Sequence, residues 1–175
     1  FQMSAKTFYG FEDILCEELK KINAIDVIKS NRIVHFKGDK ELMYKANLCL
    51  RTALKILIPL KNKEVINYEG LYKFAFDFEW ENYFHKDSSF YINSVCFGKD
   101  FTHSLYVSQR VKDGIVDRFR KIKGSRPNVE KFKPDIYIDV HIDKKSCTFS
   151  LNSSGRNLNQ RGYRKKPTKH PSTKS

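Results

Sequence analysis

The alternation of apolar patterns in the first 60 residues limits the fold of this chain more than any other feature. Apolar side chains alternate at a period of two in some segments and recur at helical spacing in others, with turn residues between them. In order, the patterns predict a strand over 1–7, a helix over 11–22, a hairpin over 27–36, a helix over 39–50 and a strand over 54–60. This β-α-β-β-α-β order predicts the two-layer ferredoxin-like arrangement.

Two single residues add detail to this prediction. Asp39 precedes the second helical pattern and is expected to cap that helix, because its carboxylate can accept a hydrogen bond from a free backbone N–H group. Pro59 lies within the last strand pattern. Since proline has no N–H group to offer a sheet, we expect that strand to lie at an edge or to end there.

A second unit follows a connector that we expect over 62–65. Its patterns predict an aromatic-rich helical segment over 68–84, a strand over 89–95, a long helix over 103–123 and two strands over 135–142 and 147–151. Beyond residue 152 the chain consists mostly of small, polar and basic residues without an apolar period, which is typical of an extended linker. The overall fold class is therefore α+β, with a mixed α/β second domain.

The net charge of +13 is distributed very unevenly along the chain. Residues 1–98 contain 14 lysines and arginines against 13 acidic residues, so almost all of the excess lies in residues 99–175. Such segregation indicates a polyanionic partner, and the absence of a basic amphipathic terminal helix favours nucleic acid over a membrane surface. The alternative is a solvated basic face followed by a disordered tail.

The helix over 103–123 is the most informative element for binding. Its apolar side chains are expected to form one buried stripe, made of Val107, Val111, Ile115, Phe119 and Ile122. Basic side chains occupy the rest of its surface, and Arg126, Lys131 and Lys133 continue them through the following loop. The backbone N–H groups near Thr102, His103 and Ser104 favour a phosphate. An ordinary solvated helix remains the alternative, because Asp113 can pair with Arg110, and Asp117 with Arg120 or Lys121.

Phe97 and Phe101 flank a glycine-containing loop of a kind that can stack on unpaired bases. The more ordinary interpretation, which we favour, makes both of them core anchors. Asp135, Asp139 and His141 share a strand face and raise the possibility of a metal or acid–base site. The polar, solvent-facing side of a half-buried strand predicts the same pattern, and we favour that interpretation.

Motifs of catalysis are absent from the sequence. It contains no G-x-G-x-x-G, Walker, G-x-S-x-G or H-E-x-x-H motif and no Pro-Pro pair, and its five histidines fall on different predicted elements. The four cysteines lack zinc-site spacing and are expected to be reduced core residues. We therefore predict no catalytic residue, bound cofactor or metal in this chain. Without a long apolar run or a secretion signal, the cytoplasm is the expected location.

A family resemblance extends over residues 1–164. The segments that carry it include Val111-Lys112-Asp113-Gly114-Ile115 and Arg161-Gly162-Tyr163-Arg164, and also 1–12, 38–39, 43–47, 50–53, 102–104, 116–119, 126–129, 134–135, 140–142 and 153–155. In that order they resemble the N-terminal region of bacterial large-subunit ribosomal RNA guanine-N2-methyltransferases. The resemblance implies a ferredoxin-like domain over 1–62, a THUMP RNA-binding domain over 63–155 and a basic linker over 156–175.

The same resemblance implies how the full-length protein works. Its partner would be RNA, with large-subunit ribosomal RNA expected, and a domain C-terminal to this region would bind S-adenosylmethionine and methylate guanine. The chain departs from the family pattern at 156–157 and 159–160 and over 165–175. Two alternatives stay open: the THUMP module of a transfer-RNA-modifying enzyme, and a stand-alone RNA-binding adaptor. The residues expected to contact RNA are Lys99, His103, Ser104, Arg110, Lys112, Arg118, Arg126, Arg156, Arg161 and Arg164.

Overall fold

The computed structural model describes residues 1–154, and its first half has the predicted order of elements. These elements are β1 (Gln2–Lys6), α1 (Glu12–Lys21), β2 (Ile25–Ser30), β3 (Ile33–Lys37), α2 (Lys40–Cys49) and β4 (Lys55–Glu64). The strands are all antiparallel in the order β2-β3-β1-β4. Asp39 caps α2 as predicted, because its Oδ1 accepts a hydrogen bond from the Leu42 amide at 2.8 Å. The ferredoxin-like prediction is confirmed.

The second half is mixed α/β, as predicted. It contains α3 (Tyr68–Asp77), the short 3₁₀ helix η1 (Trp80–Asn82), β5 (Ser89–Phe97), α4 (Ser104–Lys123), β6 (Asn128–Val129), β7 (Ile136–Asp143) and β8 (Ser146–Asn152). Strands β6, β5 and β7 are parallel, whereas β8 runs antiparallel to β7. The long helix α4 provides the crossover from β5 to β6 and β7. It ends at Gly124, whose left-handed conformation suits glycine.

Strand β4 joins the two halves into one sheet of eight strands, β2-β3-β1-β4-β8-β7-β5-β6. It pairs with β1 from Lys55 to Leu57 and with β8 from Leu57 to Glu64. The predicted connector over 62–65 is therefore wrong, because residues 62–64 still belong to the strand. Pro59 neither ends β4 nor places it at the edge of the sheet. The register shifts between Pro59 and Lys61, and such a bulge accommodates a residue without an N–H group.

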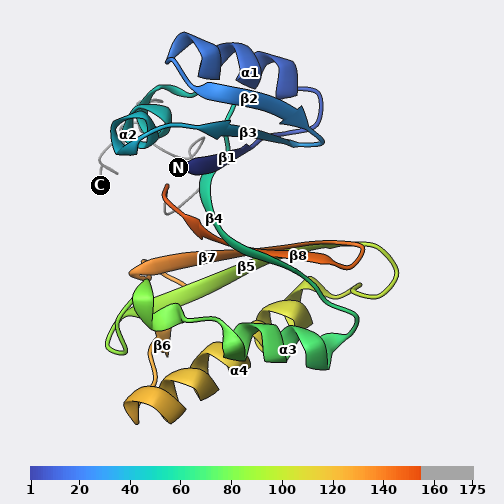
Figure 1. The fold of residues 1–175 in the computed structure, drawn as a ribbon, viewed down its shortest axis with the longest axis vertical. Coiled ribbons are helices and arrows are strands. Elements are labelled where there is room, and N and C mark those ends of the chain that lie inside the picture. Colours follow the sequence, from blue (N-terminus) through green and yellow to red (C-terminus); the bar gives the residue numbers. More distant parts are fainter. Residues whose placement is uncertain (155–175) are drawn as a thin grey trace, which may run out of the picture.

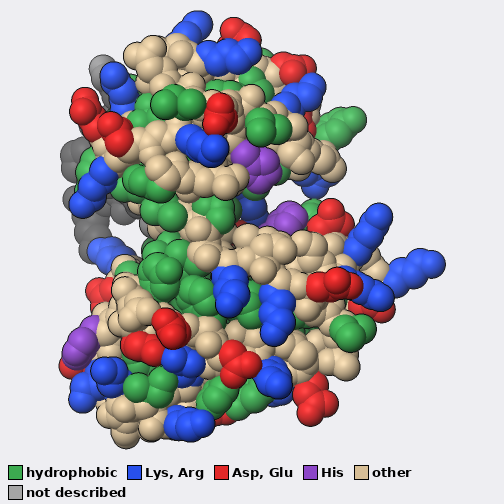
Figure 2. All heavy atoms as spheres, viewed as in Figure 1, with side chains coloured by type: hydrophobic (Ala, Val, Ile, Leu, Met, Phe, Trp, Pro, Cys, Tyr) green, Lys and Arg blue, Asp and Glu red, His purple; other side chains and the backbone are tan. Residues whose placement is uncertain are grey.

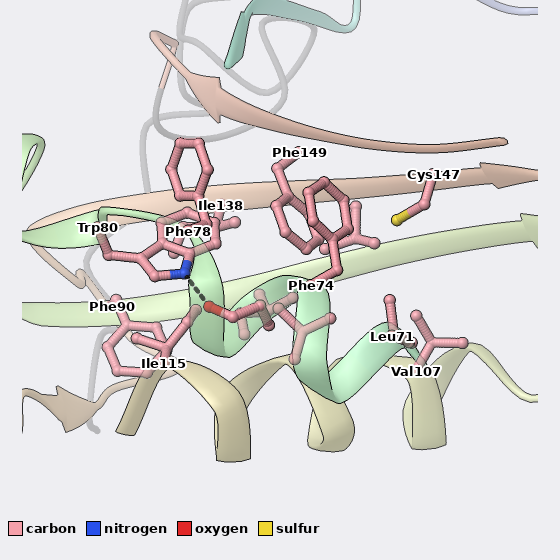
Figure 3. Close-up of a cluster of buried hydrophobic side chains, with 14 of the residues drawn as sticks. Leu71, Phe74, Phe78, Trp80, Phe90, Val107, Ile115, Ile138, Cys147 and Phe149 are labelled. Carbon is pink, nitrogen blue, oxygen red and sulfur yellow. Dashed lines mark hydrogen bonds between the residues drawn. The ribbon is translucent and has the colours of Figure 1, made fainter. Parts of the chain in front are cut away.

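Each half has its own hydrophobic core beneath its own helices. Helices α1 and α2 cover the outer side of the first half, and α3 and α4 cover the opposite outer side of the second (Figure 1). The larger core contains Trp80, Phe74 and Phe149 together with the buried stripe of α4 (Figure 3). The sheet therefore lies between two helical layers, and its inner surfaces face each other on either side of a notch (Figure 2).

Gly114 lies where α3 and α4 are in backbone contact. A Cβ atom at this position would lie 2.7 Å from Cβ of Ala75 and 2.8 Å from the carbonyl oxygen of Tyr72. We expect Gly114→Ala to lower the free energy of unfolding by about 1–3 kcal/mol, because the helices must move apart. Alanine's better helix propensity, worth up to about 1 kcal/mol, predicts the opposite sign.

Urea denaturation followed by circular dichroism measures this effect. Gln109→Ala, at an exposed position of the same helix, is the control and should change the stability by less than about 0.5 kcal/mol. A Gly114→Ala variant as stable as the parent protein would contradict the close approach of the two helices.

The cysteines only partly follow their prediction. All four are free, as expected, and Cys147 is buried in the larger core, where desolvation raises its pKa to about 12. Cys16 and Cys96 are half-buried, and Cys49 is exposed at the end of α2. The expectation of four core cysteines is thus wrong for Cys49, because the last residue of α2 points away from the core.

Candidate nucleic-acid interface

Helix α4 and the loop over 124–135 form the surface that the sequence singles out. Val107, Val111, Ile115 and Phe119 form the buried stripe as predicted. Ile122 does not belong to it, since its side chain is 46% exposed and lies outside both cores. The predicted stripe is therefore one turn too long, and the last turn of α4 is exposed on nearly all sides. This end of the helix carries Arg120, Lys121 and Lys123, which also suit the negative end of the helix dipole.

The candidates in the middle of α4 have acidic or aromatic partners. The Arg110 guanidinium lies 4.7 Å from the centre of the Tyr72 ring and 3.4 Å from the Asp113 carboxylate. Lys112 Nζ is 2.9 Å from the other Asp113 oxygen. The pairing of Asp113 with Arg110 was expected from their spacing and is confirmed. On the next turn, Asp117 lies 3.8 Å from Arg120 and accepts a hydrogen bond from the Tyr72 hydroxyl, which raises the Tyr72 pKa to about 12.

Arg118 is the most firmly held of the candidates. Its Nε and Nη2 donate to the two carboxylate oxygens of Glu81 at 2.8 and 2.6 Å, and Nη1 donates to the Phe76 carbonyl oxygen at 3.0 Å. The bidentate pair raises the Arg118 pKa and lowers the Glu81 pKa, in each case mainly through their hydrogen bonds. With three donors engaged inside the second domain, Arg118 ties α4 to α3 and η1.

Four cations at the C-terminal end of the surface are free of such partners. Within residues 1–154, no carboxylate lies within 4.0 Å of the charged groups of Lys123, Arg126, Lys131 or Lys133. All except the half-buried Arg126 are exposed. We call these four residues the basic cluster. Only Arg126 was among the residues that we expected to contact RNA, although Lys131 and Lys133 were expected to extend the basic surface.

The remaining candidates lie at the other end of α4. Lys99 is exposed in the preceding loop, and His103 and Ser104 are exposed at the helix start, where His103 makes no side-chain capping bond. A helix of 20 residues is about 30 Å long, so these residues are separated from the basic cluster by roughly that distance. The structure therefore divides the described candidates into two end groups and a partnered middle. Arg156, Arg161 and Arg164 lie outside the described residues.

The two phenylalanines beside the loop between β5 and α4 lie in different surroundings. Phe101 is a core anchor, as favoured, and packs edge-on against Tyr68 with 5.1 Å between ring centres. Phe97 is 44% exposed, so the same prediction is wrong for it. It occupies the inner side of the sheet, where its ring centre is 5.7 Å from that of His141, rather than the side covered by helices.

Asp135, Asp139 and His141 do not form one site. Asp139 is buried and binds Lys6 Nζ at 2.8 Å and Lys55 Nζ at 3.5 Å, so its strand face is turned toward the first half. The expectation that this face is solvent-exposed is therefore wrong for Asp139. Asp135 is exposed and accepts a hydrogen bond from the Ser89 amide. His141 is half-buried, and desolvation, followed by the charge of Lys6, lowers its pKa. Among the described residues, no group of three possible ligands could hold a metal ion.

The surface also has two shallow hollows, of about 290 and 330 Å³. The first is lined by Asp77, Glu79 and Asn82 near η1, and the second by Pro134, Tyr137 and Ser154 near the end of the described chain. Neither combines a nucleophile with a base and an orienting group. In the part of the chain that the structure covers, no helix is long and apolar enough to cross a membrane.

Fold and surface together define a ferredoxin-like domain joined through a shared strand to a second α+β domain with a basic helix and loop. Comparison with known families agrees with this division. Residues 2–57 match the RlmL ferredoxin-like domain, and residues 66–152 match the THUMP domain. The described chain therefore consists of an RlmL ferredoxin-like domain followed by a THUMP domain.

Curated relatives carry the same region within much longer chains. The ribosomal RNA large subunit methyltransferase K/L of Shewanella frigidimarina (strain NCIMB 400) is 35% identical over 164 residues, which is 94% of this chain and 23% of that protein. Its counterpart in Cellvibrio japonicus (strain Ueda107) is 34% identical over 93% of this chain and 22% of its own. The chain thus spans less than a quarter of the length of these relatives.

A solved structure shares the fold. SMU.472, a putative methyltransferase complexed with SAH, superposes with a TM-score of 0.79 at 24% sequence identity. The match covers 95% of this chain and 45% of that one. The likeness extends over both halves, so the continuous sheet through β4 is an arrangement found in another protein.

Proposed function

We propose that this chain is the RNA-binding portion of an S-adenosylmethionine-dependent ribosomal RNA (guanine-N2-)methyltransferase. In this proposal it positions large-subunit ribosomal RNA in the cytoplasm for a catalytic domain located C-terminally in the full-length protein. The observation that carries the proposal is the basic cluster, four cations on one helix end and loop without carboxylate partners among the described residues. The names of the curated relatives support the substrate and the methyl transfer.

The basic cluster suits a phosphate backbone for a simple electrostatic reason. A cation that already has a carboxylate partner must lose that partner before it can neutralise a phosphate, whereas an unpaired, solvated cation needs only to release water and counterions. We therefore propose that Lys123, Arg126, Lys131 and Lys133 make the main contacts. Lys99, His103 and Ser104 would contact a second stretch of backbone, and Arg110, Lys112 and Arg118 would contribute less because of their partners.

Salt dependence of RNA binding tests this function. The four main phosphate contacts alone give a slope of log affinity against log salt of roughly −2.8 to −3.6, so affinity for a ribosomal RNA fragment should fall at least about 50- to 150-fold between 50 and 200 mM salt. The triple variant Arg126→Ala, Lys131→Ala, Lys133→Ala should lower the slope by about two to three. Filter binding over a salt series measures both quantities.

The matched control removes the same charge from the first domain. Lys21, Lys40 and Lys45 are exposed and have no carboxylate within 4.0 Å among the described residues, so replacing all three with alanine should leave the slope nearly unchanged. An affinity independent of salt would contradict RNA binding, and equal losses in the two triple variants would contradict the assignment to the basic cluster.

A transfer-RNA-modifying enzyme is the second candidate, because THUMP domains are not confined to enzymes that act on ribosomal RNA. Competition between intact transfer RNA and a naked large-subunit RNA fragment separates the two candidates. Clear preference for transfer RNA would replace the first proposal. Calorimetry with S-adenosylmethionine is expected to show no saturable binding to residues 1–175, because the cofactor site belongs to the proposed catalytic domain.

A further inference from the structure

Phe132 is more exposed than any other large hydrophobic side chain in residues 1–154. Its side chain is 78% exposed in the loop between β6 and β7, directly between Lys131 and Lys133 of the basic cluster. The sequence analysis did not select it, because a single phenylalanine outside any periodic pattern gives no signal of its own. The ring contributes nothing to the core and lies in the chain between two cations without a carboxylate partner among the described residues, so it is available for contact with a ligand.

The loop that carries Phe132 is held at several points. The Phe132 amide donates to the Glu130 carboxylate at 3.0 Å, and the Glu130 amide donates to the Phe90 carbonyl oxygen of β5 at 3.0 Å. On the far side, the Asp135 amide donates to Ser89 Oγ and the Ser89 amide donates back to the Asp135 carboxylate, both at 2.9 Å. The ring is therefore presented on a backbone tied to a strand on both sides, which lowers the entropy lost on binding.

We propose that Phe132 is a stacking platform for an unpaired base of single-stranded RNA, with Lys131 and Lys133 contacting the phosphates on either side of that base. The inference rests on the proposed RNA-binding function and deepens it. A solvent-exposed ring flanked by cations matches how single strands are bound, by base stacking combined with backbone neutralisation. Among the described residues, neither lysine has a carboxylate within 4.0 Å, and the nearby Glu130 carboxylate accepts a hydrogen bond from the Phe132 amide, so charge favours a polyanion as the partner.

Removal of the ring measures the stacking. Phe132→Ala should weaken binding of a single-stranded RNA 12-mer about 5- to 150-fold, the range for one stacked base, and Phe132→Trp should bind at least as well as the parent protein. An abasic 12-mer with the same number of phosphates should bind the parent protein and the alanine variant equally. Tyr9→Ala is the matched control, since Tyr9 is 75% exposed but lies in the first domain, and it should change neither affinity.

Fluorescence of the Phe132→Trp variant gives an independent measurement. The unsubstituted chain of 175 residues has one tryptophan, Trp80, which is fully buried, so the new exposed indole dominates any change in the signal on binding. Single-stranded RNA should quench it saturably, and the abasic 12-mer should not.

The outcomes separate the two proposals. If the parent protein binds RNA with the expected salt slope but Phe132→Ala binds the single-stranded 12-mer equally well, the stacking proposal is wrong and the RNA-binding function stands. If Phe132→Ala loses as much affinity for the abasic 12-mer as for the ordinary 12-mer, the stacking proposal is likewise wrong. If the parent protein does not bind any RNA, both proposals fail.

Discussion

Replacing Asp139 with alanine is expected to lower the free energy of unfolding by about 3–5 kcal/mol, which is the usual cost of removing one partner from a buried ion pair. The Asp139 side chain is only 3% exposed, and it neutralises Lys6 and Lys55, whose side chains are 16% and 18% exposed. Without the carboxylate, two ammonium groups remain poorly solvated beside each other. Because Lys6 lies on β1, Lys55 on β4 and Asp139 on β7, the loss affects the junction of the two domains.

Thermal and urea denaturation of Asp139→Ala measure this effect. For a chain of this size, 3–5 kcal/mol corresponds to a fall in melting temperature of roughly 6–20 °C. Asp143→Ala is the control, since Asp143 is on the same strand but exposed, and no cation lies within 4.0 Å of it among the described residues. The stability of Asp139→Asn should lie between those of Asp139→Ala and Asp143→Ala, because the amide keeps an acceptor but loses the charge. A loss below about 1 kcal/mol for Asp139→Ala would show that water reaches the two lysines.

Trp80→Ala is also expected to lower the free energy of unfolding by about 3–5 kcal/mol, for a different reason. The indole is fully buried, and its ring centre lies 4.6 Å from that of Phe78 and 5.2 Å from that of Phe149 (Figure 3). Its Nε1 also donates to the Ala75 carbonyl oxygen at 2.8 Å, so the variant leaves both a large cavity and a buried acceptor without its donor.

Circular dichroism should follow the unfolding of Trp80→Ala, because this variant has no tryptophan left to report by fluorescence. Tyr83→Ala provides the comparison: Tyr83 stacks on Phe78 at 5.6 Å but is 43% exposed, and its loss should cost about 1 kcal/mol. Trp80→Phe should recover much of the stability. Equal stabilities of the Trp80 and Tyr83 alanine variants would contradict the central position of the indole in this core.

The local elements were predictable because each has its own signature in the chain. The β-α-β-β-α-β order, the cap at Asp39 and the long basic helix follow from periodicity and capping chemistry, which depend only on neighbouring residues. The same holds for the concentration of positive charge in the second half. The family resemblance, which reached the same two domains, rests on residues spread over those elements.

Other features depend on residues far apart in the sequence, and only the tertiary structure decided them. Pro59 suggested an edge, yet β4 runs through the middle of the sheet because a bulge accommodates the missing N–H group. Asp139 and Arg118 looked like solvated charges, and both have partners: Lys6 is 133 residues from Asp139, and Glu81 is 37 residues from Arg118. A free cation and a partnered one are identical in a sequence. What separates them is which strand or helix packs alongside, and that follows from long-range packing rather than from any local pattern.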